Sequence, residues 1–557
     1  MLKKLGLLTA GLAMAGGVAY GDNNVVKTLK VESVGNKSAF ELKLTGYVQV
    51  SNVKSSELTF VDSSGQSKRV TVRNNKALAR LQPGKYTVNA NDVTVKKIGE
   101  NLFYSVVGAY NTDEIATVTV DNKTSGKTGM FLYNWNYLRN NILDPFAVIT
   151  LGSAYAPEID QWRAEGRMVF RNCNVTNPAD GKRGLPFWDE LGANAQVDGI
   201  GPDEFIVPAG RKDPNDASLG YTRPGHGFTE AHLQGIRNWS KKYPDKTFYA
   251  WVGIPWNGDC TAIKPLYDAV KSSPNGVILW EAYLSGDGGE KDLARVFTNR
   301  GRDFKAVSGG TLADYIIAPA TYEYMDNNGE IDFKVLLDYQ FHLMATDPVF
   351  ADLRGFGMWV AYYTEPEILR WYAKLVQHYG VDGETTHLSD KYGYKLYPGI
   401  LGGHNWDNRR NDWQLTGNAA IVDKKAAKLN QGYLPFSNLN LLRLEVGPGK
   451  KGGVSQVMKN LKPGQLYMVK VNYFTPDDPE KSDIAIDISL ENAVVLESTL
   501  RYVQDFTRRS PHVYNFRKIV FRAGDKPVRL TIGGRVDAAQ SKVVMIDQVQ
   551  AAPYFAE

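Results

Sequence analysis

The pattern of apolar and polar positions divides the chain into three regions. In the first, apolar residues recur with a period of two in Phe40–Leu44, Tyr47–Val50, Glu57–Val61 and Ala116–Val120. This period is typical of half-buried β-strands. Turn residues separate the runs, as in Asp62-Ser-Ser-Gly65. The pattern therefore predicts a small antiparallel β-sandwich over residues 22–126.

The middle region, residues 127–412, alternates apolar runs with helical segments. The predicted strands are 146–152, 167–172, 197–204, 247–253, 276–283, 315–322, 357–363 and 396–404, with 130–135 as a competing first strand. Continuous apolar runs are typical of parallel strands that are buried on both faces. Eight strand–helix repeats in about 285 residues predict a (β/α)8 barrel, that is, a TIM barrel. A doubly wound open sheet is the alternative, although the chain has no Gly-rich phosphate loop.

The last region, residues 413–557, returns to short strands. It begins Trp413-Gln-Leu-Thr-Gly-Asn-Ala, continues through Leu-Lys-Pro-Gly464 and ends with Val543-Val-Met-Ile-Asp547-Gln-Val-Gln. The region resembles the carbohydrate-binding jelly rolls appended to secreted glycosidases, which implies an all-β jelly roll. No tryptophan follows Trp413, although flat aromatic rings usually hold sugars. The remaining ring candidates are Tyr467, Tyr473, Tyr502 and Tyr514.

The first 21 residues predict a secretory signal peptide. Lys3 and Lys4 precede an apolar run, and Ala19-Tyr20-Gly21 is a small-x-small cleavage site. The run is shorter than the ~20 residues that a membrane span needs. We therefore expect a secreted or periplasmic protein with no membrane span.

Composition narrows the class of protein further. The chain is 43% hydrophobic and 22% charged, which is ordinary for a globular protein. A net charge of +5 gives no electrostatic case for a nucleic-acid partner. Cys173 and Cys260 are too few for a disulfide-built fold, and they form either one disulfide or two separate thiols. The sequence pattern does not indicate whether the protein is a monomer or an oligomer.

Carboxylates stand where several of the predicted barrel strands end. Asp203 and Glu204 end the predicted third strand, and Glu281 ends the fifth. Chemistry in such barrels is located at the carboxyl ends of the strands. A glycosidase needs one acid to protonate the leaving oxygen and a second carboxylate to attack or to activate water. We predict Glu281 as the acid, because Trp280 and Tyr283 would provide apolar walls, and Asp203 or Glu204 as the nucleophile or base.

With these residues, the middle region resembles a secreted glycoside hydrolase of the barrel type. The stretch Asp198-Gly-Ile-Gly-Pro-Asp-Glu204 is similar to the D-G-x-D-x-D-x-E strand of the chitinase family. Gly201 replaces an expected Asp, and Phe205 replaces the catalytic Glu. The substrate-assisted mechanism of that family is therefore not carried over. The resemblance implies hydrolysis of glycosidic bonds in an oligo- or polysaccharide.

Aromatic and polar residues near the strand ends are the candidates for substrate binding, because ring faces stack on sugars. They are Trp135, Asn172, Trp251, Trp256, Trp280, Tyr283, Tyr322, Trp359, Glu365, His404 and Trp406. The alternative for Glu365, which precedes Pro366, is a helix cap. No cofactor is expected. The stretch Asp326-Asn-Asn-Gly-Glu330-Ile-Asp332 has the alternate oxygen ligands of a calcium loop, but it also fits an ordinary turn.

Two other functions remain open. A non-catalytic glycan-binding or cell-surface protein would be favoured if Glu204 and Glu281 faced outward. A polysaccharide lyase would use basic residues or Tyr beside an acidic sugar. The middle region has 29 Lys and Arg against 36 Asp and Glu, which does not favour an anionic substrate.

Overall fold

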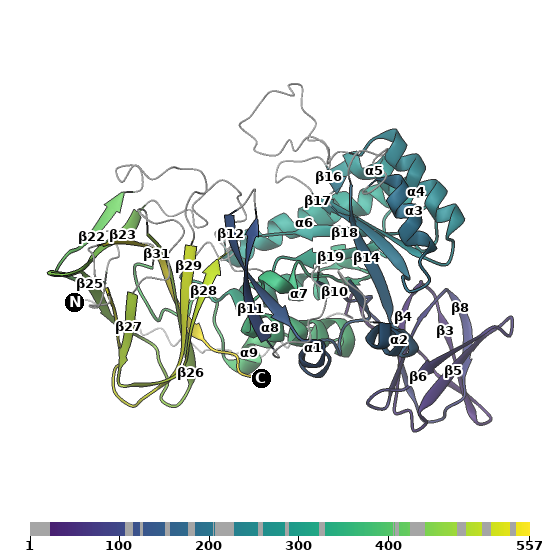
Figure 1. Ribbon diagram of the computed structural model, residues 1–557. Helices are drawn as coiled ribbons and strands as arrows, with labels where there is room; N and C mark the ends of the chain where they lie inside the picture. Colours follow the sequence, from purple (N-terminus) through teal and green to yellow (C-terminus); the bar gives the residue numbers. More distant parts are fainter. Residues whose placement is uncertain are drawn as a thin grey trace, which may run out of the picture.

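The protein has a central parallel sheet covered by helices and a β-rich region on each side of it (Figure 1). The computed structural model describes residues 23–105, 115–122, 126–150, 156–175, 184–203, 205–206, 228–253, 260–284, 289–321, 329–404, 406, 412–423, 440–475, 486–503, 514–534 and 542–557. The predicted signal peptide lies outside these residues. None of the described helices is long and apolar enough to cross a membrane.

The N-terminal region contains two antiparallel sheets, with the orders β1-β9-β4-β7 and β2-β3-β8-β5-β6. Their strands are β1 (Lys27–Thr28), β2 (Glu32–Val34), β3 (Lys37–Leu42), β4 (Gly46–Ser51), β5 (Glu57–Asp62), β6 (Ser67–Thr71), β7 (Lys76–Leu81), β8 (Gly84–Val88) and β9 (Thr94–Ile98). Phe40 and Phe60 from one sheet and Val48 and Val50 from the other share one apolar core. The all-β character predicted from the period of two is confirmed.

The central sheet contains eight parallel strands in the order β10-β13-β14-β15-β17-β18-β19-β20. They are β10 (Leu102–Tyr104), β13 (Val148–Thr150), β14 (Met168–Asn174), β15 (Gly199–Asp203), β17 (Thr247–Gly253), β18 (Val277–Ala282), β19 (Tyr315–Pro319) and β20 (Gly355–Phe356), and the short β16 (Phe205–Ile206) also pairs with β17. Each of the eight strands is followed along the chain by one helix. The helices are α1 (Trp135–Asn141), α2 (Ala156–Ala164), α3 (Leu185–Ala193), α4 (Glu230–Lys242), α5 (Lys264–Val270), α6 (Gly289–Val307), α7 (Phe333–Thr346) and α8 (Pro366–Gln377), with α9 (Leu388–Tyr392) after them.

The eight strands nearly close into a barrel, because the last strand lies beside the start of the first. The backbone N–H of Glu100 donates to the carbonyl of Arg354 at 2.9 Å. The N–H of Phe356 donates to Oδ1 of Asn101 at 3.3 Å. A Cβ on Gly355 would lie 2.5 Å from the Glu100 carbonyl oxygen, so only glycine permits this approach.

The first strand of the barrel differs from the prediction. It is β10, which lies within the residue range expected for the N-terminal sandwich. Residues 130–135 instead overlap β12 (Gly126–Tyr133), which pairs antiparallel with β11 (Ile115–Asn122). The predicted eighth strand, 396–404, is wrong: this segment forms no strand, and its Ile400 joins the C-terminal core. Asp203 and Glu281 therefore end the fourth and sixth strands.

A buried carboxylate joins the N-terminal region to the amino end of the barrel. Glu100 is fully buried and accepts from Nε of Arg354 at 2.8 Å and from Nε of Arg80, in β7, at 3.2 Å. Its other oxygen accepts from the hydroxyl of Tyr249, inside the barrel, at 2.8 Å. Burial alone would raise the pKa of Glu100, but the two guanidinium groups and this hydrogen bond lower it to about 2.

The C-terminal region also contains two antiparallel sheets, with the orders β21-β25-β30-β27 and β22-β23-β31-β26-β29-β28. Their strands are β21 (Gln414–Thr416), β22 (Ala419–Asp423), β23 (Asn440–Gly447), β24 (Lys450–Lys451), β25 (Gly453–Val457), β26 (Leu466–Phe474), β27 (Ile486–Glu491), β28 (Ala493–Val503), β29 (Tyr514–Ala523), β30 (Arg529–Gly534) and β31 (Lys542–Pro553), with β24 paired to β23. Side chains of both sheets form one apolar core. The all-β character predicted for this region is confirmed.

The larger C-terminal sheet is held to the barrel by buried ion pairs. Nζ of Lys518, in β29, lies 2.9 Å from Glu365 and 2.5 Å from Glu367. Nζ of Lys334, in α7, lies 3.0 Å from the other oxygen of Glu367. All four side chains are at most 7% exposed. The hairpin β11–β12 stands in the same junction, with β12 against β28 (Figure 1).

We expect Glu100→Gln to destabilise the protein by about 3 kcal/mol or more at pH 7, because it leaves two buried guanidinium groups without their carboxylate. The folded-state pKa of Glu100 lies below its ordinary value of 4.5. The stabilisation is therefore complete above pH 4.5 and is lost as the pH falls toward about 2. Urea unfolding of both proteins as a function of pH measures this difference. Glu57→Gln, which breaks an exposed ion pair to Arg69, is the control. A stability difference that stays constant down to pH 2.5 would contradict the expectation.

We expect Lys518→Met to destabilise the protein by about 3–5 kcal/mol, because Glu365 and Glu367 would remain buried without this cation. The matched control is Lys459→Met. Lys459 makes an ion pair to Asp412 of similar length, 2.8 Å, but both side chains are exposed, and such pairs are worth about 0–1 kcal/mol. Chemical unfolding of the full chain measures both. Equal effects of the two substitutions would rule out a special role for the buried network.

Candidate functional site

Alternation along the strands decides which side chains enter the barrel, since neighbours in a strand point to opposite faces. Trp280 packs against Phe297 and Phe304 of α6, with ring centroids 5.4 and 4.8 Å away. Its neighbour Glu281 therefore points inward. Phe248 packs against Trp188 of α3 and Trp239 of α4, so Tyr249, Trp251 and Gly253 share the inner face of β17.

Three aromatic rings form a floor near the carboxyl end of the barrel. Tyr104, Trp251 and Trp359 come from β10, β17 and the segment after β20. Their ring centroids lie 4.9 Å (Tyr104–Trp251), 4.7 Å (Tyr104–Trp359) and 5.5 Å (Trp251–Trp359) apart. Tyr104 and Trp251 are buried, whereas Trp359 is partly exposed. The floor can thus offer ring surface toward the mouth of the barrel while its inner part fills the core.

Glu281 is held at this floor by two residues of the neighbouring strand. The indole Nε1 of Trp251 donates a hydrogen bond to Oε1 of Glu281. A Cβ on Gly253 would lie 3.1 Å from Oε2, so this glycine leaves room for the second oxygen. The carboxyl group is half-buried.

Asp203 ends β15 on the same inner face as Gly201. A Cβ on Gly201 would lie 2.4 Å from the ring of Phe170, so the ring occupies the space where the chitinase pattern has an Asp. Two strand steps separate Asp203 from Glu281, through β17, which confirms the spacing expected for the pair. Both carboxyl groups are half-buried.

The charge of Asp203 acts on two buried neighbours. Burial, and then the negative charge of Asp203, raise the pKa of Tyr104 well above its ordinary value. The same two causes raise the pKa of Cys173. Cys173 is a free, buried thiol and stays protonated at neutral pH. It is therefore not a nucleophile, because nucleophilic cysteines are thiolates.

Three of the buried polar atoms that have no hydrogen-bond partner among the described residues lie at this end of the barrel. Within the described structure, Oδ1 of Asn172, the hydroxyl of Tyr104 and Nε1 of Trp359 accept or donate no hydrogen bond. Such atoms are rare in native proteins because each one costs free energy. Together they offer two donors and one acceptor, the kind of groups that a polyhydroxylated ligand satisfies.

Six predicted site residues come together at this end of the barrel: Asn172, Asp203, Trp251, Glu281, Tyr283 and Trp359. Tyr283 follows Glu281 on the same side of the chain and is half-buried. Glu204, Trp256 and Tyr322 lie outside the described residues.

The other predicted residues have structural roles, and three of them are tryptophans. Trp280 packs on α6, outside the barrel. Trp135 begins α1 and packs edge-on against Trp162. Trp406 is fully buried in the C-terminal core, where its Nε1 donates to the carbonyl of Asp547. The aromatic residue type alone does not separate a ring that binds a sugar from one that fills a core.

Glu365 and His404 belong to the junction with the C-terminal region. Glu365 precedes α8 at the N-cap position, but its side chain makes no capping hydrogen bond and instead pairs with Lys518. His404 is buried beside β31, where its carbonyl accepts from the N–H of Val549 and its Nδ1 lies 3.2 Å from Glu330. Neither residue lies among the inward side chains of the barrel strands.

Sequence reasoning missed Tyr104 and Gly253. Tyr104 was assigned to the N-terminal sandwich, because β10 contains only three residues and follows nine sandwich strands. Its signal is the unbroken apolar run Leu102–Tyr104, which is typical of a strand buried on both faces. Gly253 has no side chain, and only the position of Glu281 shows what it does.

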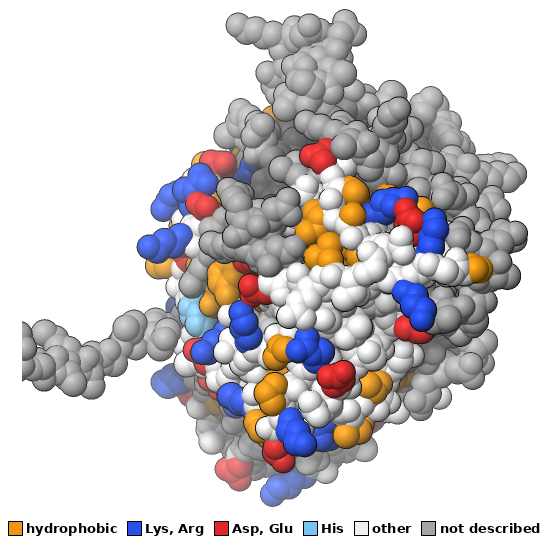
Figure 2. Space-filling view, turned by 90° about the vertical axis from the view of Figure 1, so that its left-hand side faces the viewer, with side chains coloured by type: hydrophobic (Ala, Val, Ile, Leu, Met, Phe, Trp, Pro, Cys, Tyr) orange, Lys and Arg blue, Asp and Glu red, His pale blue; other side chains and the backbone are white. Residues whose placement is uncertain are grey.

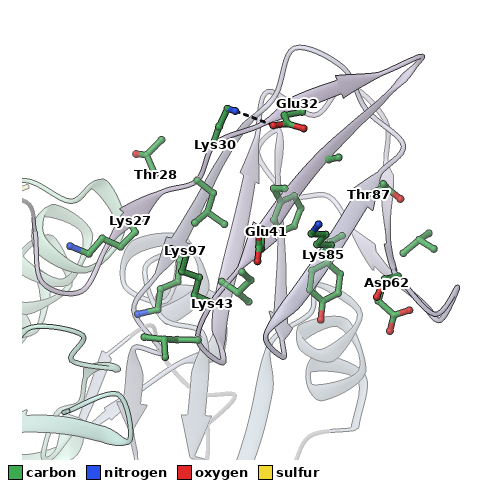
Figure 3. A pocket seen from close by; sticks show the side chains of 18 of the residues that line it. Lys27, Thr28, Lys30, Glu32, Glu41, Lys43, Asp62, Lys85, Thr87 and Lys97 are labelled. Atoms are coloured by element: carbon green, nitrogen blue, oxygen red, sulfur yellow. Dashed lines mark hydrogen bonds and ion pairs between the residues drawn. The ribbon is translucent and has the colours of Figure 1, made fainter. Parts of the chain in front are cut away.

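A hollow of 920 Å³ lies on the N-terminal region (Figure 3). It is bordered by Asp352, which precedes β20 and so marks the amino end of the barrel. Five lysines (Lys27, Lys30, Lys43, Lys85, Lys97) and four acids (Glu32, Glu41, Asp62, Asp352) line it. The charges nearly balance, and Lys30 and Glu32 already pair at 3.0 Å. We place the candidate site at the barrel mouth, where two inward carboxylates meet aromatic rings.

The described residues contain no group of three His, Cys, Asp or Glu side chains that could hold a metal ion. Of the predicted calcium loop, Asp326 lies outside these residues. Asp332 caps α7 and lies 3.1 Å from Nζ of Lys334. Glu330 is beside His404. Both described carboxylates thus have protein partners.

The C-terminal region offers few rings for a glycan. Tyr467 and Tyr473 lie in its apolar core, and the side chains of Tyr502 and Tyr514 lie outside the description. The strongly exposed large apolar side chains among its described residues are aliphatic: Leu415, Val457, Val494, Val495 and Leu496. Figure 2 shows this side of the molecule, where acidic, basic and small apolar areas are interspersed.

No model of a protein family matches the chain, and no curated protein matches it. Among solved structures, β-glucuronidase 2 of Bacteroides uniformis is similar at 9% identity over 94% of this chain and 80% of that chain, with a TM-score of 0.29. The chitinase ChiW of Paenibacillus sp. str. FPU-7 is similar at 10% identity over 98% and 52%, with a TM-score of 0.27. The module TmCBM61, in complex with β-1,4-galactotriose, is similar at 10% identity over 26% and 88%, with a TM-score of 0.15. These low values leave the barrel geometry as the basis for assigning a function.

Proposed function

We propose that the protein is a secreted glycoside hydrolase. Its catalytic domain would be a (β/α)8 barrel, and its C-terminal region a jelly roll. The observation that supports this is the pair of inward carboxylates, Asp203 and Glu281, two strands apart above an aromatic floor. Two carboxylates that flank a sugar can divide the work of protonating the leaving oxygen and of supplying or activating the nucleophile.

The floor fits a sugar substrate for a second reason. Sugar rings have apolar faces and polar edges. Trp359 offers a partly exposed ring, and Asn172 and Tyr104 offer polar atoms without partners. A ring that stacks on indole and exchanges hydrogen bonds at its rim would satisfy both features.

The alternatives are less consistent with the geometry. A non-catalytic protein would be favoured if Glu204 and Glu281 faced outward. Glu281 faces inward, and Glu204 lies outside the described residues. A lyase that used Tyr104 as a base would need its phenolate. Burial and the charge of Asp203 raise the pKa of Tyr104 and so keep the phenol protonated.

We expect the protein to hydrolyse at least one member of a panel of soluble oligosaccharides. Asp203→Asn and Glu281→Gln should each lower kcat by about 10²–10⁴-fold, because each removes one of the two carboxylates. Product release measured by chromatography tests this, with circular dichroism to confirm folding. Glu230→Gln, at an exposed position on α4, is the control. Near-normal turnover of both site variants would exclude this pair.

We expect Trp359→Leu to raise KM about tenfold or more, because it removes a partly exposed ring from the floor, and a tenfold change corresponds to about 1.4 kcal/mol. Trp280→Phe should leave KM unchanged and lower Tm, since Trp280 packs on α6. Steady-state kinetics and thermal unfolding of both variants measure this contrast. If the two variants shift KM equally, the ring at Trp359 does not contact substrate.

A further inference from the structure

The surroundings of Glu281 bear on its role in the proposed site. The sequence favoured Glu281 as the acid on the assumption that Trp280 and Tyr283 surround it with apolar walls. In the structure, Trp280 lies on the opposite face of β18, against α6. Of the two expected apolar walls, only Tyr283 is on the same side of the strand as Glu281.

Glu281 instead has a donor aimed at it. Nε1 of Trp251 carries only a donor and no acceptor, so the oxygen that faces it must accept. Oε1 of Glu281 does so. A hydrogen bond donated to a carboxylate stabilises its charged form relative to its neutral form. Because Trp251 is buried and its ring is packed between Tyr104 and Trp359, the donor cannot easily turn away.

Gly253 completes this arrangement from the same strand. Oε2 of Glu281 lies over Gly253, where a Cβ would approach to 3.1 Å. Contacts that short are tighter than ordinary van der Waals contacts, so a side chain here would require Oε2 to shift by a few tenths of an ångström. Trp251 and Gly253 are two residues apart and face the same way. Strand β17 therefore fixes one oxygen of Glu281 and leaves space for the other.

We propose that Glu281 is the ionised carboxylate of the site, the nucleophile or base, and that Trp251 and Gly253 are positioning residues that hold it in that state. This rests on the proposed glycosidase function and reverses the roles expected from the sequence. The proton donor is then on the β15 side of the mouth, where Asp203 is the described candidate.

With these roles, the bonds and protons of the reaction balance whether the configuration at the anomeric carbon is retained or inverted. If the enzyme retains configuration, an oxygen of Glu281 forms a bond to the anomeric carbon as the bond to the leaving oxygen breaks. If it inverts, Glu281 takes a proton from the water whose oxygen forms that bond. In both courses the leaving oxygen departs with the proton of the acid.

The test compares substrates of one sugar with different leaving groups, using the glycoside that the wild type hydrolyses. A 2,4-dinitrophenyl glycoside needs little protonation on leaving, whereas a methyl glycoside needs full protonation. Loss of the nucleophile or base slows both substrates, but loss of the acid spares the activated one. We expect Glu281→Gln to slow both by at least about 10²-fold.

Dinitrophenyl turnover by Glu281→Gln within tenfold of the wild type would overturn the assignment, because it would identify Glu281 as the acid or as dispensable. The glycosidase function would still stand. If the wild type hydrolyses neither this sugar class nor any member of the oligosaccharide panel, the proposed function fails instead, and this assignment fails with it.

The positioning role has a separate readout. Trp251→Phe keeps a ring but removes the donor, so the acidic limb of the kcat/KM–pH profile should move to higher pH. Gly253→Ala should lower kcat without a comparable loss of Tm. Trp280→Phe is the control, and its pH profile should match the wild type. If the acidic limb of Trp251→Phe stays where it is in the wild type, Trp251 does not set the charge of Glu281.

Discussion

The buried carboxylate of Glu100 is the interaction on which the architecture depends. It accepts from Arg354 at the last barrel strand, from Arg80 of the N-terminal region and from Tyr249 inside the barrel. A charge with no exposure is costly unless it is paired and hydrogen-bonded. Here one carboxylate satisfies donors from three parts of the molecule. The same carboxylate therefore stabilises both the near-closure of the barrel and the attachment of the N-terminal region.

Ring packing connects the Glu100 ion pairs with the mouth of the barrel. Tyr249, which donates to Glu100, packs against Phe170, and Phe170 packs against Tyr104. Tyr104 in turn touches Trp251 and Trp359. Close-packed interiors transmit displacement because they leave no space to absorb it. The orientation of Trp251, and through it the position of Glu281, therefore depends on a packed column that ends at the Glu100 ion pairs.

Part of the barrel could be predicted from sequence because strands β14, β17 and β18 are six or seven residues long and largely apolar, and helices separate them. Strands β14, β17 and β18 lie where the pattern placed them. The first strand could not be predicted, because three residues carry no period and the β11–β12 hairpin separates it from its helix. The predicted strand 396–404, which contains Ile400, was wrong for another reason. Its segment is apolar because it packs into the C-terminal core, and burial against one domain has the same composition as burial against another.

The sequence pattern places Glu281 near the end of a barrel strand, where the structure has it, but does not predict its surroundings. Adjacent residues in a strand point to opposite faces of the sheet. Trp280 therefore does not contact the carboxylate of Glu281, although it is next to it in the chain. The group that acts on the carboxylate is Trp251, thirty positions away on the neighbouring strand. Pairing between strands decides such contacts, and it is set by the whole sheet rather than by local sequence. For the same reason Gly201, which looked like a missing acid, is explained by the ring of Phe170 on the adjacent strand.

The atoms without partners at the mouth also bear on the balance between stability and activity. The hydroxyl of Tyr104 is buried and makes no hydrogen bond among the described residues, which costs about 1–3 kcal/mol relative to a satisfied group. A residue chosen for stability alone at that position would be Phe. Retaining the hydroxyl is understandable if a ligand completes its hydrogen bond, since sites built for binding are commonly left unsatisfied in the free protein. A ligand that completed this hydrogen bond would recover that cost as binding free energy.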